Sequence, residues 1–442
     1  MIAYHAKRLP VHKGPAAWSE ILPGQPAATP LEGDITADLV VIGAGFAGLS
    51  AARRALQIDP GLDVVILEAG RVAEGAAGRN SGFMIDLPHD LASTDYAGSG
   101  DDAARIALNR QAIAFAQAAA EEYGIPQDFI DPSGKVNGAA SARGHAHNES
   151  YARHLSGLGE PCEMLDAQAM QALTGSSYYL SGLYTPGTAT LQSAGYVRGF
   201  ARGLSANAVL HEASPVTGFA AVGNEWHVST PYGSVTAPRI ILGTNGHLES
   251  FGFAAGRLMH VFLYASMTPE LPDGAVGGAA RWGVTPADPM GTTMRRIDSA
   301  QGGNRIVTRT CASFKPGMVA SDAALARAAR IHAEKFGNRF PALRGMEMAY
   351  SWAGHLCLSR NDVSVVGEVE EGVYAACCQN GLGTARGTLT GIGAAEMAFG
   401  VSSGITNALR AEPEPTRLPP RPFSDLGANA YLRWKEYRAG KE

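Results

Sequence analysis

Short apolar runs alternate with a helical pattern near the start of the chain. Ala37 to Ile42 is an apolar run bounded by turn residues, and Leu62 to Glu68 is a second one. Such runs are typical of strands that are buried on both faces of a parallel sheet. The Ala-rich segment Phe46 to Leu56 lies between them and has the composition of a helix. This order predicts a strand–helix–strand unit at the beginning of the fold.

Two longer helices are predicted further along the chain. Asp101 to Tyr123 begins with two acids, which suit the positive end of a helix. Ser321 to Phe336 places apolar residues on one helical face, starts with a capping serine and is expected to end at Gly337. His332 falls on that apolar face, so we expect a buried core histidine whose hydrogen bonds are satisfied.

Strands are expected in the remaining apolar and alternating segments. Glu225 to Thr230 and Arg239 to Leu242 read as strands, and so does Thr292 to Ile297. Gly372 to Cys377 is a further strand, and it leads through a glycine-rich turn into an Ala/Gly-rich helix that reaches Phe399. By contrast, residues 1–33 hold five prolines among polar and small residues, which predicts an extended arm with little regular structure.

Length and charge exclude some classes of protein. A chain of 442 residues is long enough for two domains. The net charge is −5 and there is no long basic run, which argues against nucleic acid as a partner. There is no apolar stretch that suits a secretory signal or a bilayer span, so we expect a cytoplasmic enzyme without a transmembrane segment.

The cysteines suggest neither a disulfide framework nor a metal site. Five are present, which is an odd number, and their spacing fits neither a zinc site nor paired disulfides. Reduced thiols and no bound metal are the expectation.

The first chemical motif is the G-x-G-x-x-G run from Gly43 to Gly48, which follows a predicted strand and opens a predicted helix. Gly43 permits the tight turn, Gly45 lets a pyrophosphate approach the backbone, and Gly48 lets the helix pack on the strand. The helix N-terminus supplies N–H donors and a positive dipole. Glu68 ends the next strand, where its carboxylate can accept the ribose hydroxyls of an adenosine. The pattern therefore predicts a dinucleotide, and by itself it leaves NAD and FAD open.

The segments that follow favour FAD. Glu68-Ala69-Gly70-Arg71 runs into the small-residue loop Gly75-Ala76-Ala77-Gly78-Arg79-Asn80-Ser81-Gly82, where side chains would block an extended cofactor. Here the chain resembles the D-amino-acid-oxidase superfamily of flavoproteins, and within it the glycine oxidase, sarcosine oxidase and gamma-glutamylputrescine oxidase group. The last of these carries a similar arm and a similar loop. Ala77 and Ser81 depart from that group's loop pattern, and neither change obstructs the backbone path.

The resemblance resumes in five later segments and covers most of residues 34–405. These segments are 191–204, 215–216, 243–246, 352–354 and 379–384. The family's fold is then implied: an α/β, Rossmann-like FAD-binding domain of the glutathione-reductase type, interleaved with an α+β substrate domain. The FAD-binding domain would comprise 34–88, 190–250 and 351–405, and the substrate domain 89–189 and 251–350. Residues 1–33 would form the arm and 406–442 a C-terminal tail.

The motif and the resemblance together give the expected FAD contacts. Val216 would lie on the adenine side and Asn380 to Thr384 along the flavin, near a second helix N-terminus that stabilises negative charge on the reduced ring. The residues expected at the cofactor are Gly43, Gly45, Phe46, Ala47, Gly48, Glu68, Ala69, Arg71, Gly78, Arg79, Asn80, Ser81, Val216, Asn245, Gly354, Asn380, Gly381, Leu382, Gly383 and Thr384.

The resemblance implies oxidation of the C–N bond of an amine or amino acid. A hydride would pass to flavin N5, the imine would hydrolyse in water, and O2 would be reduced to H2O2. Such chemistry needs positioning, desolvation and electrostatics more than a protein nucleophile or metal. The candidate catalytic residues are Trp352, His355, Arg295 and Arg296. The alternatives without a catalytic role are that Trp352 packs in the core and that His355 lies at the surface.

Strand geometry bears on the two arginines. Neighbouring strand residues point to opposite faces, so we expect one of Arg295 and Arg296 to face the flavin pocket and the other to face solvent or a surface carboxylate. Periodicity favours Arg296 and the family position favours Arg295, which leaves the choice open. We also expect a flavin held without a covalent bond, since neither His355 nor Cys357 matches the family's tethering position with certainty.

Three alternatives to an oxidase remain at this point. A dehydrogenase of the same fold would pass its electrons to a quinone or a carrier protein. A nicotinamide-dependent dehydrogenase would be colourless. A flavin-binding subunit of a larger oxidase would bind FAD without catalysing a reaction.

Overall fold

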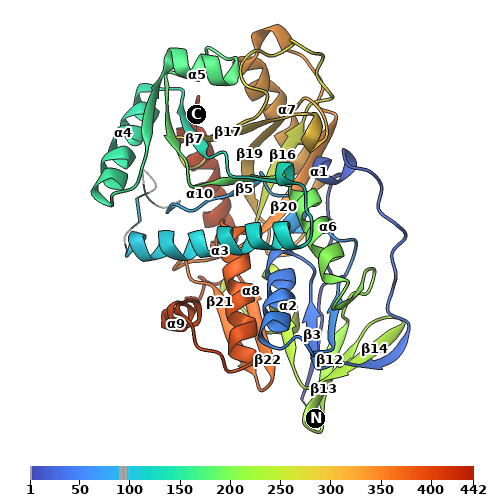
Figure 1. The fold of residues 1–442 in the computed structure, drawn as a ribbon. Coiled ribbons are helices and arrows are strands. Elements are labelled where there is room, and N and C mark those ends of the chain that lie inside the picture. Colours follow the sequence, from blue (N-terminus) through green and yellow to red (C-terminus); the bar gives the residue numbers. More distant parts are fainter. Residues whose placement is uncertain (1, 89–92, 94–96, 99) are drawn as a thin grey trace.

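The computed structural model describes residues 2–88, 93, 97–98 and 100–442, and a six-stranded sheet lies in the lower half of the molecule as Figure 1 shows it. Its strands in spatial order are β11 (Val209–His211), β4 (Val64–Leu67), β3 (Leu39–Ile42), β15 (Ile240–Leu242), β22 (Val373–Cys377) and β21 (Val365–Glu370). The first five run parallel, and β21 is antiparallel to β22. All six strands come from the ranges 34–88, 190–250 and 351–405, so distant parts of the chain lie side by side here.

Both faces of this sheet are buried, and consecutive residues of β3 show how. Leu39 and Val41 belong to the apolar cluster that includes the helices α2 (Phe46–Ile58), α8 (Ala385–Ala398) and α6 (Ser193–Leu204). Val40 and Ile42 belong to a second cluster on the opposite face. A small sheet covers that face, with the strands β1 (Ala3–His5), β12 (Gly218–Val222), β13 (Glu225–Ser229), β14 (Gly233–Ala237) and β2 (Gly33–Thr36). Burial on both faces explains why these strands are continuous apolar runs.

Helices α2 and α8 lie against each other at very short range. A Cβ atom on Gly391 would lie 2.1 Å from the carbonyl oxygen of Ala47, and one on Gly387 would lie 3.2 Å from the Cβ of Phe46. Each helix follows a strand of the same parallel sheet, so both N-termini point to the same edge. Glycines in α8 therefore set the distance between two positive helix ends.

A larger mixed sheet forms the second half of the molecule. Its strands in order are β20 (Tyr350–Ser359), β16 (Leu258–Met267), β19 (Arg305–Phe314), β18 (Thr293–Ile297), β17 (Trp282–Pro286), β7 (Lys135–Ala139), β9 (Ser181–Thr185) and β8 (Glu163–Asp166). The strand β20 begins at the boundary proposed for the last FAD-binding segment, yet it pairs with β16 in this sheet. The two sheets are therefore linked through β20.

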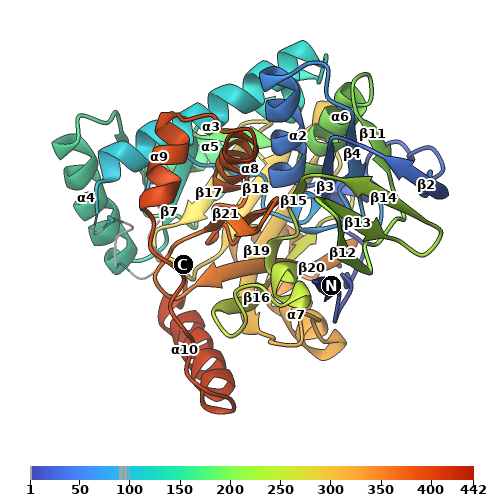
Figure 2. The same ribbon diagram turned by 90° about the horizontal axis from the view of Figure 1, so that it is seen from below.

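The remaining elements cover these layers. They are α1 (Ala17–Glu20), α3 (Asp102–Glu122), α4 (Ala142–Gly157), α5 (Ala167–Thr174), α7 (Asp322–Arg339), α9 (Gly404–Ala411), α10 (Phe423–Ala439) and the small sheet of β5 (Phe83–Met84), β10 (Ala189–Leu191) and β6 (Ile130–Asp131). Figure 2 shows α10 at the end of the molecule opposite α3. It packs on β19, where Asn429 accepts a hydrogen bond from the Phe314 N–H (3.0 Å). Among the described residues, we find no helix with the length and apolarity that crossing a membrane requires.

Most expected elements are present within a few residues of their predicted ends. Ser321 caps α7 as expected, by accepting a hydrogen bond from the Ala324 N–H. His332 is a buried core histidine, with Nδ1 2.7 Å from the Ser266 hydroxyl and Nε2 3.1 Å from the Thr310 carbonyl. The predicted end at Gly337 is wrong, because α7 continues to Arg339.

The N-terminal arm is largely irregular and closely packed. Its regular parts before β2 are β1 and the single turn α1. Trp18 in α1 is fully buried, and its indole N–H donates to the Asn80 carbonyl (2.8 Å). The arm is therefore fixed to the body of the protein and to the loop that contains Asn80.

We expect Gly391→Val to destabilise the fold strongly, because its side chain would collide with the α2 backbone near Ala47. Overpacking of this kind costs about 3 kcal/mol. Thermal and denaturant unfolding measure the loss. Gly427→Ala is the control, since Gly427 lies in α10 with open space around it and should become slightly more stable. Equal stability of Gly391→Val and wild type would contradict the close approach of α2 and α8.

Candidate functional site

A cavity lies along the carboxyl edge of the six-stranded sheet, and we call it the sheet-edge cavity. Its wall includes residues that come just after four parallel strands. Gly43 follows β3, Glu68 follows β4, Gly243 follows β15, and Gln379 comes two residues after the end of β22. The opposite wall is formed by β16, β19 and β20 of the larger sheet. The carboxyl ends of parallel strands are the usual place for a ligand in open α/β sheets.

Most of the expected cofactor residues line this cavity. Those in its wall are Gly43, Gly45, Phe46, Ala47, Glu68, Ala69, Arg79, Asn80, Ser81, Val216, Asn245, Gly354, Gly381 and Gly383, together with His355 from the catalytic candidates. Sequence motifs that lie far apart in the chain are thus brought to one cavity.

The three motif glycines differ in what surrounds them. Gly43 has a φ of +103°, and a Cβ there would lie 2.7 Å from the Gly243 carbonyl oxygen. A Cβ on Gly48 would lie 1.7 Å from the Gly43 oxygen, so this glycine serves helix packing behind the cavity. Gly45 is in ordinary contact with Ala77 at 3.6 Å and opens toward the cavity. The helix α2 that follows has no side-chain cap, which leaves its first N–H groups available to a ligand.

Glu68 holds the turn after β3 and faces the cavity. Its carboxylate accepts hydrogen bonds from the Ala44 N–H (2.8 Å) and the Gly70 N–H (3.1 Å). Burial raises the pKa of Glu68, while these backbone hydrogen bonds act in the opposite direction. A half-buried carboxylate with spare acceptor positions suits hydroxyl donors of a ligand.

The loop that contains Arg79 is braced by two tryptophans. The Arg79 side chain lies among carbonyl oxygens, including those of Lys13 (3.1 Å) and Ala353 (3.2 Å), and burial lowers its pKa to about 10. The indole N–H of Trp352 donates to the Arg79 carbonyl (3.0 Å). Trp352 is fully buried beneath the loop and is not part of the cavity wall. Trp352 therefore packs in the core, which was the alternative to a catalytic role for this residue.

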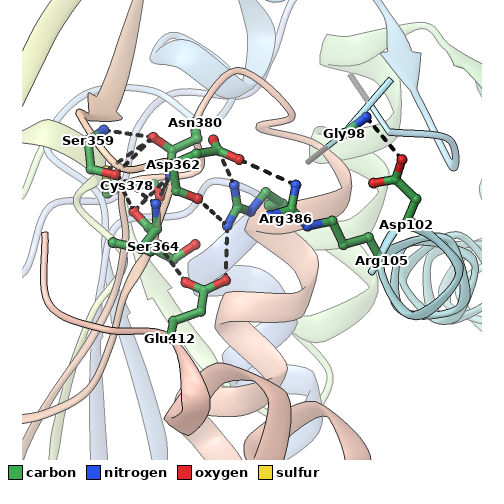
Figure 3. A network of polar contacts seen from close by, with 11 residues as sticks. Gly98, Asp102, Arg105, Ser359, Asp362, Ser364, Cys378, Asn380, Arg386 and Glu412 are labelled. Carbon is green, nitrogen blue, oxygen red and sulfur yellow. Dashed lines mark hydrogen bonds and ion pairs between the residues drawn. The ribbon is translucent and has the colours of Figure 1, made fainter. Parts of the chain in front are cut away.

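The second glycine loop alternates between the cavity and the protein behind it. Gly381 and Gly383 line the cavity. The Asn380 side chain points away: its Oδ1 accepts from the Ser359 N–H (2.7 Å) within the network of Figure 3. The Thr384 hydroxyl donates to the Phe83 carbonyl (2.8 Å), and Leu382 packs beside the cluster that contains Phe83. The side chains of these three expected residues thus anchor the loop rather than line the cavity.

Other expected residues lie outside the cavity wall. A Cβ on Gly78 would meet the Ala73 oxygen at 1.8 Å, so this glycine is required by packing, as Gly48 is. The Arg71 side chain pairs with Glu212 (3.2 Å).

The expectation for Arg295 and Arg296 is only partly met. They do point to opposite faces of β18, but neither lines the cavity and neither faces solvent. Arg295 donates to the Gly82 carbonyl (2.7 Å) and stacks over Trp18, while Arg296 donates to the Gly277 carbonyl (2.8 Å). Every residue of β18 is buried, so both faces of this strand are covered.

The structure adds functional candidates that the sequence did not indicate. Arg309 of β19 lines the cavity, which none of the motifs revealed. His247 lines it as well, two residues after the Asn245 that was expected there. Burial lowers the pKa of His247 to about 4 and the pKa of His355 well below its ordinary value. These imidazoles are neutral at pH 7.

The arm supplies another part of the wall. Residues of the arm from Ala6 to His12 lie against the cavity, and burial lowers the pKa of His12 to about 4. The Ala353 N–H donates to the Lys13 carbonyl (3.0 Å), which ties the arm to β20. The arm therefore helps to close the site, a role that its irregular sequence did not suggest.

Comparison with known proteins gives relatives of matching length. A probable oxidoreductase OrdL of Rhizobium meliloti is 24% identical over 414 residues, which is 90% of this chain and 91% of the relative. The gamma-glutamylputrescine oxidoreductase of Escherichia coli is 24% identical over 360 residues, 78% of this chain and 79% of its own.

Solved structures share the fold. Glycine oxidase from Geobacillus kaustophilus matches with a TM-score of 0.68 at 17% identity, over 84% of this chain and 96% of its own. L-amino acid deaminase from Proteus myxofaciens matches with a TM-score of 0.65 at 14% identity, over 93% of this chain and 99% of its own. The expected fold class is confirmed.

The sequence model of the DAO family, described as FAD dependent oxidoreductase, matches residues 38–397. This range contains both glycine loops and nearly every element that borders the sheet-edge cavity. The resemblance noted in the sequence is thereby confirmed, and the chain belongs to the DAO family of FAD-dependent oxidoreductases.

Proposed function

We propose that FAD lies in the sheet-edge cavity with its pyrophosphate against residues 43–47 and its adenosine at Glu68 and Val216. The uncapped first turn of α2 supplies N–H donors for the phosphates. Gly45 leaves room for the backbone approach, and the Glu68 carboxylate suits the ribose hydroxyls. These features suit the phosphates and the ribose of the cofactor.

The flavin ring would lie between Gly381 and Gly383 on one side and β20 on the other. The N-terminus of α8 has no side-chain cap, so its N–H groups and dipole are available to stabilise negative charge there. Bound FAD supplies the hydride acceptor and the route for electrons to a second substrate. The protein contributes binding, orientation and electrostatics.

The substrate proposed is an amine or amino acid whose C–N bond is oxidised. The observation that carries this proposal is the neutral imidazole of His355 in the cavity wall, beside the region proposed for the ring. A neutral imidazole offers an acceptor nitrogen to an amine N–H, and only an unprotonated amine nitrogen has a lone pair that can assist loss of hydride. Gamma-glutamylputrescine oxidoreductase, glycine oxidase and L-amino acid deaminase are named for amine or amino-acid substrates, which supports the same substrate class.

Arg309 is the proposed partner for an anionic group of the substrate. Its strand position places it in the cavity wall beside β16, and a guanidinium binds a carboxylate in bidentate fashion. Trp352, Arg295 and Arg296 would then act indirectly, by supporting the loops around the cofactor.

Oxygen is the proposed electron acceptor, so the overall reaction converts amine, O2 and water to a carbonyl compound, released amine or ammonia, and H2O2. A dehydrogenase is the second candidate, because one neighbour by fold is L-proline dehydrogenase from P. horikoshii, with a TM-score of 0.64 at 16% identity. Peroxide formation in air distinguishes the two.

We expect the purified protein to carry one FAD per chain, and acid denaturation to release it into the supernatant because the flavin is held without a covalent bond. Gly45→Val should lose the flavin and keep its fold, since the added side chain would occupy the pyrophosphate's place. Gly157→Val is the control, because open space surrounds Gly157 at the end of α4. Absorbance of the supernatant and circular dichroism measure both effects. Colour in the pellet would show a covalent tether, and Cys357 would be mutated first.

Anaerobic mixing with amines, polyamines, gamma-glutamyl amines and small amino acids should bleach the yellow colour with at least one of them. Readmitting air should restore it with one H2O2 per substrate. A protein that is bleached but reoxidises only with a quinone or a carrier protein is a dehydrogenase. A protein that none of these compounds bleaches would contradict the proposed function.

Arg309→Met should lower kcat/KM about 100-fold for a carboxylate-bearing substrate, the rate equivalent of one charge-assisted contact worth about 3 kcal/mol. The matched amine without a carboxylate should be little affected. Arg305→Met serves as the control, because Arg305 lies on the same strand and pairs with the exposed Glu270 (3.6 Å). An equal loss for both substrates would indicate that Arg309 supports the fold instead.

A further inference from the structure

Three side chains from separate elements form a hydrogen-bonded chain that ends at the sheet-edge cavity. His260 of β16 lies with its Nε2 2.6 Å from the Glu249 carboxylate, which belongs to the short helix η3 (Asn245–Phe251). The other nitrogen of His260, Nδ1, lies 3.2 Å from Nε2 of His355 on β20. His355 in turn lines the cavity. No motif in the sequence links these three residues.

The surroundings fix the rings of this chain. A Cβ on Gly246 would lie 2.8 Å from both His260 Nδ1 and His355 Cε1, so only glycine fits there without displacing the imidazoles. The ring of Phe262 stacks on that of His355, with centroids 4.9 Å apart and planes 11° apart. His260 is buried, while a quarter of the Glu249 side chain remains exposed. Packing thus holds the hydrogen bonds in register.

The Glu249 carboxylate at the outer end fixes the direction of the first hydrogen bond. Burial opposes the charge on Glu249, but hydrogen bonds from His260 and from the Gly256 N–H lower its pKa, so its carboxylate is ionised and can only accept. The Nε2 of His260 must therefore carry a hydrogen. A doubly protonated His260 would donate from Nδ1 as well; when Nε2 carries the single hydrogen of the ring, Nδ1 is an acceptor and His355 donates to it from Nε2.

This order leaves His355 with its lone pair on Nδ1. Within the described residues, Nε2 is the ring nitrogen of His355 that finds a partner, and the ring itself faces the cavity. Burial disfavours a charge on His355 and lowers its pKa well below the ordinary value, and burial also lowers the pKa of the neighbouring His12 and His247 to about 4. The other charged or titratable side chains that line the cavity are those of Arg8, Glu68, Arg79, Tyr264, Arg309 and Cys357.

We propose that Glu249 and His260 are positioning residues that fix His355 in the Nε2–H tautomer, so that its Nδ1 accepts a hydrogen bond from the substrate's amine N–H. The consequence concerns the amine lone pair. An amine that donates to Nδ1 keeps its lone pair free to assist departure of the hydride from the adjacent carbon. The opposite tautomer would present Nδ1–H, which would bind that lone pair and slow the reaction.

This inference rests on the proposed amine substrate, but its first test needs no substrate. Holoenzyme labelled with 15N-histidine should show His355 as a neutral Nε2–H tautomer in long-range 1H–15N spectra, with the signal assigned by its loss in His355→Gln. Glu249→Leu should shift His355 toward the Nδ1–H form, since the outer acceptor is gone. A wild-type His355 that is Nδ1–H or imidazolium would overturn the proposal, whatever the substrate proves to be.

The kinetic test separates positioning from folding. Glu249→Leu and His260→Phe should each lower kcat about tenfold or more while KM changes less, because the lost orientation matters most as hydride leaves; tenfold corresponds to about 1.4 kcal/mol. Glu249→Asp, which keeps an acceptor, should recover part of the rate. The control is Glu270→Leu, which removes an exposed carboxylate outside the Glu249–His260–His355 hydrogen-bonded series and should leave kcat unchanged. Unaltered kcat and unaltered tautomer in Glu249→Leu would refute the assignment.

Discussion

The close packing of α2 on α8 is the constraint on which the site depends. Gly391 and Gly387 let the two helices approach until the backbone of α2 fills the space where side chains would otherwise lie. Each N-terminus carries roughly half a positive charge, and the contact brings two such ends to one edge of the sheet. A ligand there with phosphates at one end and a reducible ring at the other meets a favourable field at both ends. The remaining elements extend this arrangement: Glu68 fixes the first turn, and the side chains of Asn380 and Thr384 fix the second.

Buried arginines in this protein act mainly as braces for loops. Arg79 and Arg295 direct their guanidinium groups at backbone carbonyls of the arm, β20 and the segment around Gly82. Desolvation lowers the pKa of both groups, but the carbonyls satisfy their donors. Removing one of them would leave several carbonyl oxygens unpaired in the interior, which is costly in a site of this kind. A basic residue near a cofactor is therefore weak evidence of a role in catalysis unless its surroundings are known.

The sequence predicted those parts of the fold whose signals are local. The strand–turn–helix around Gly43, the cap at Ser321 and the core position of His332 all follow from residues within one or two turns of each other. The site residues that the sequence missed depend on pairings between distant strands. The two-residue periodicity of a strand correctly placed Arg295 and Arg296 on opposite faces, yet it could not reveal that both faces of β18 are buried. The link between Glu249, His260 and His355 arises only when η3, β16 and β20 meet, which no spacing along the chain encodes.

The N-terminal arm gives the cavity a wall that is not part of either large sheet. It is attached by the short pairing of β1 with β12, by the burial of Trp18 and by carbonyls that Arg79 and Ala353 engage. Between these attachments the chain from Ala6 to His12 contributes side chains to the cavity itself. Because the arm makes few backbone hydrogen bonds to strands, its local opening costs less free energy than opening of the sheets that it covers. The residence time of a molecule held behind the arm therefore depends on how often the arm opens as well as on affinity.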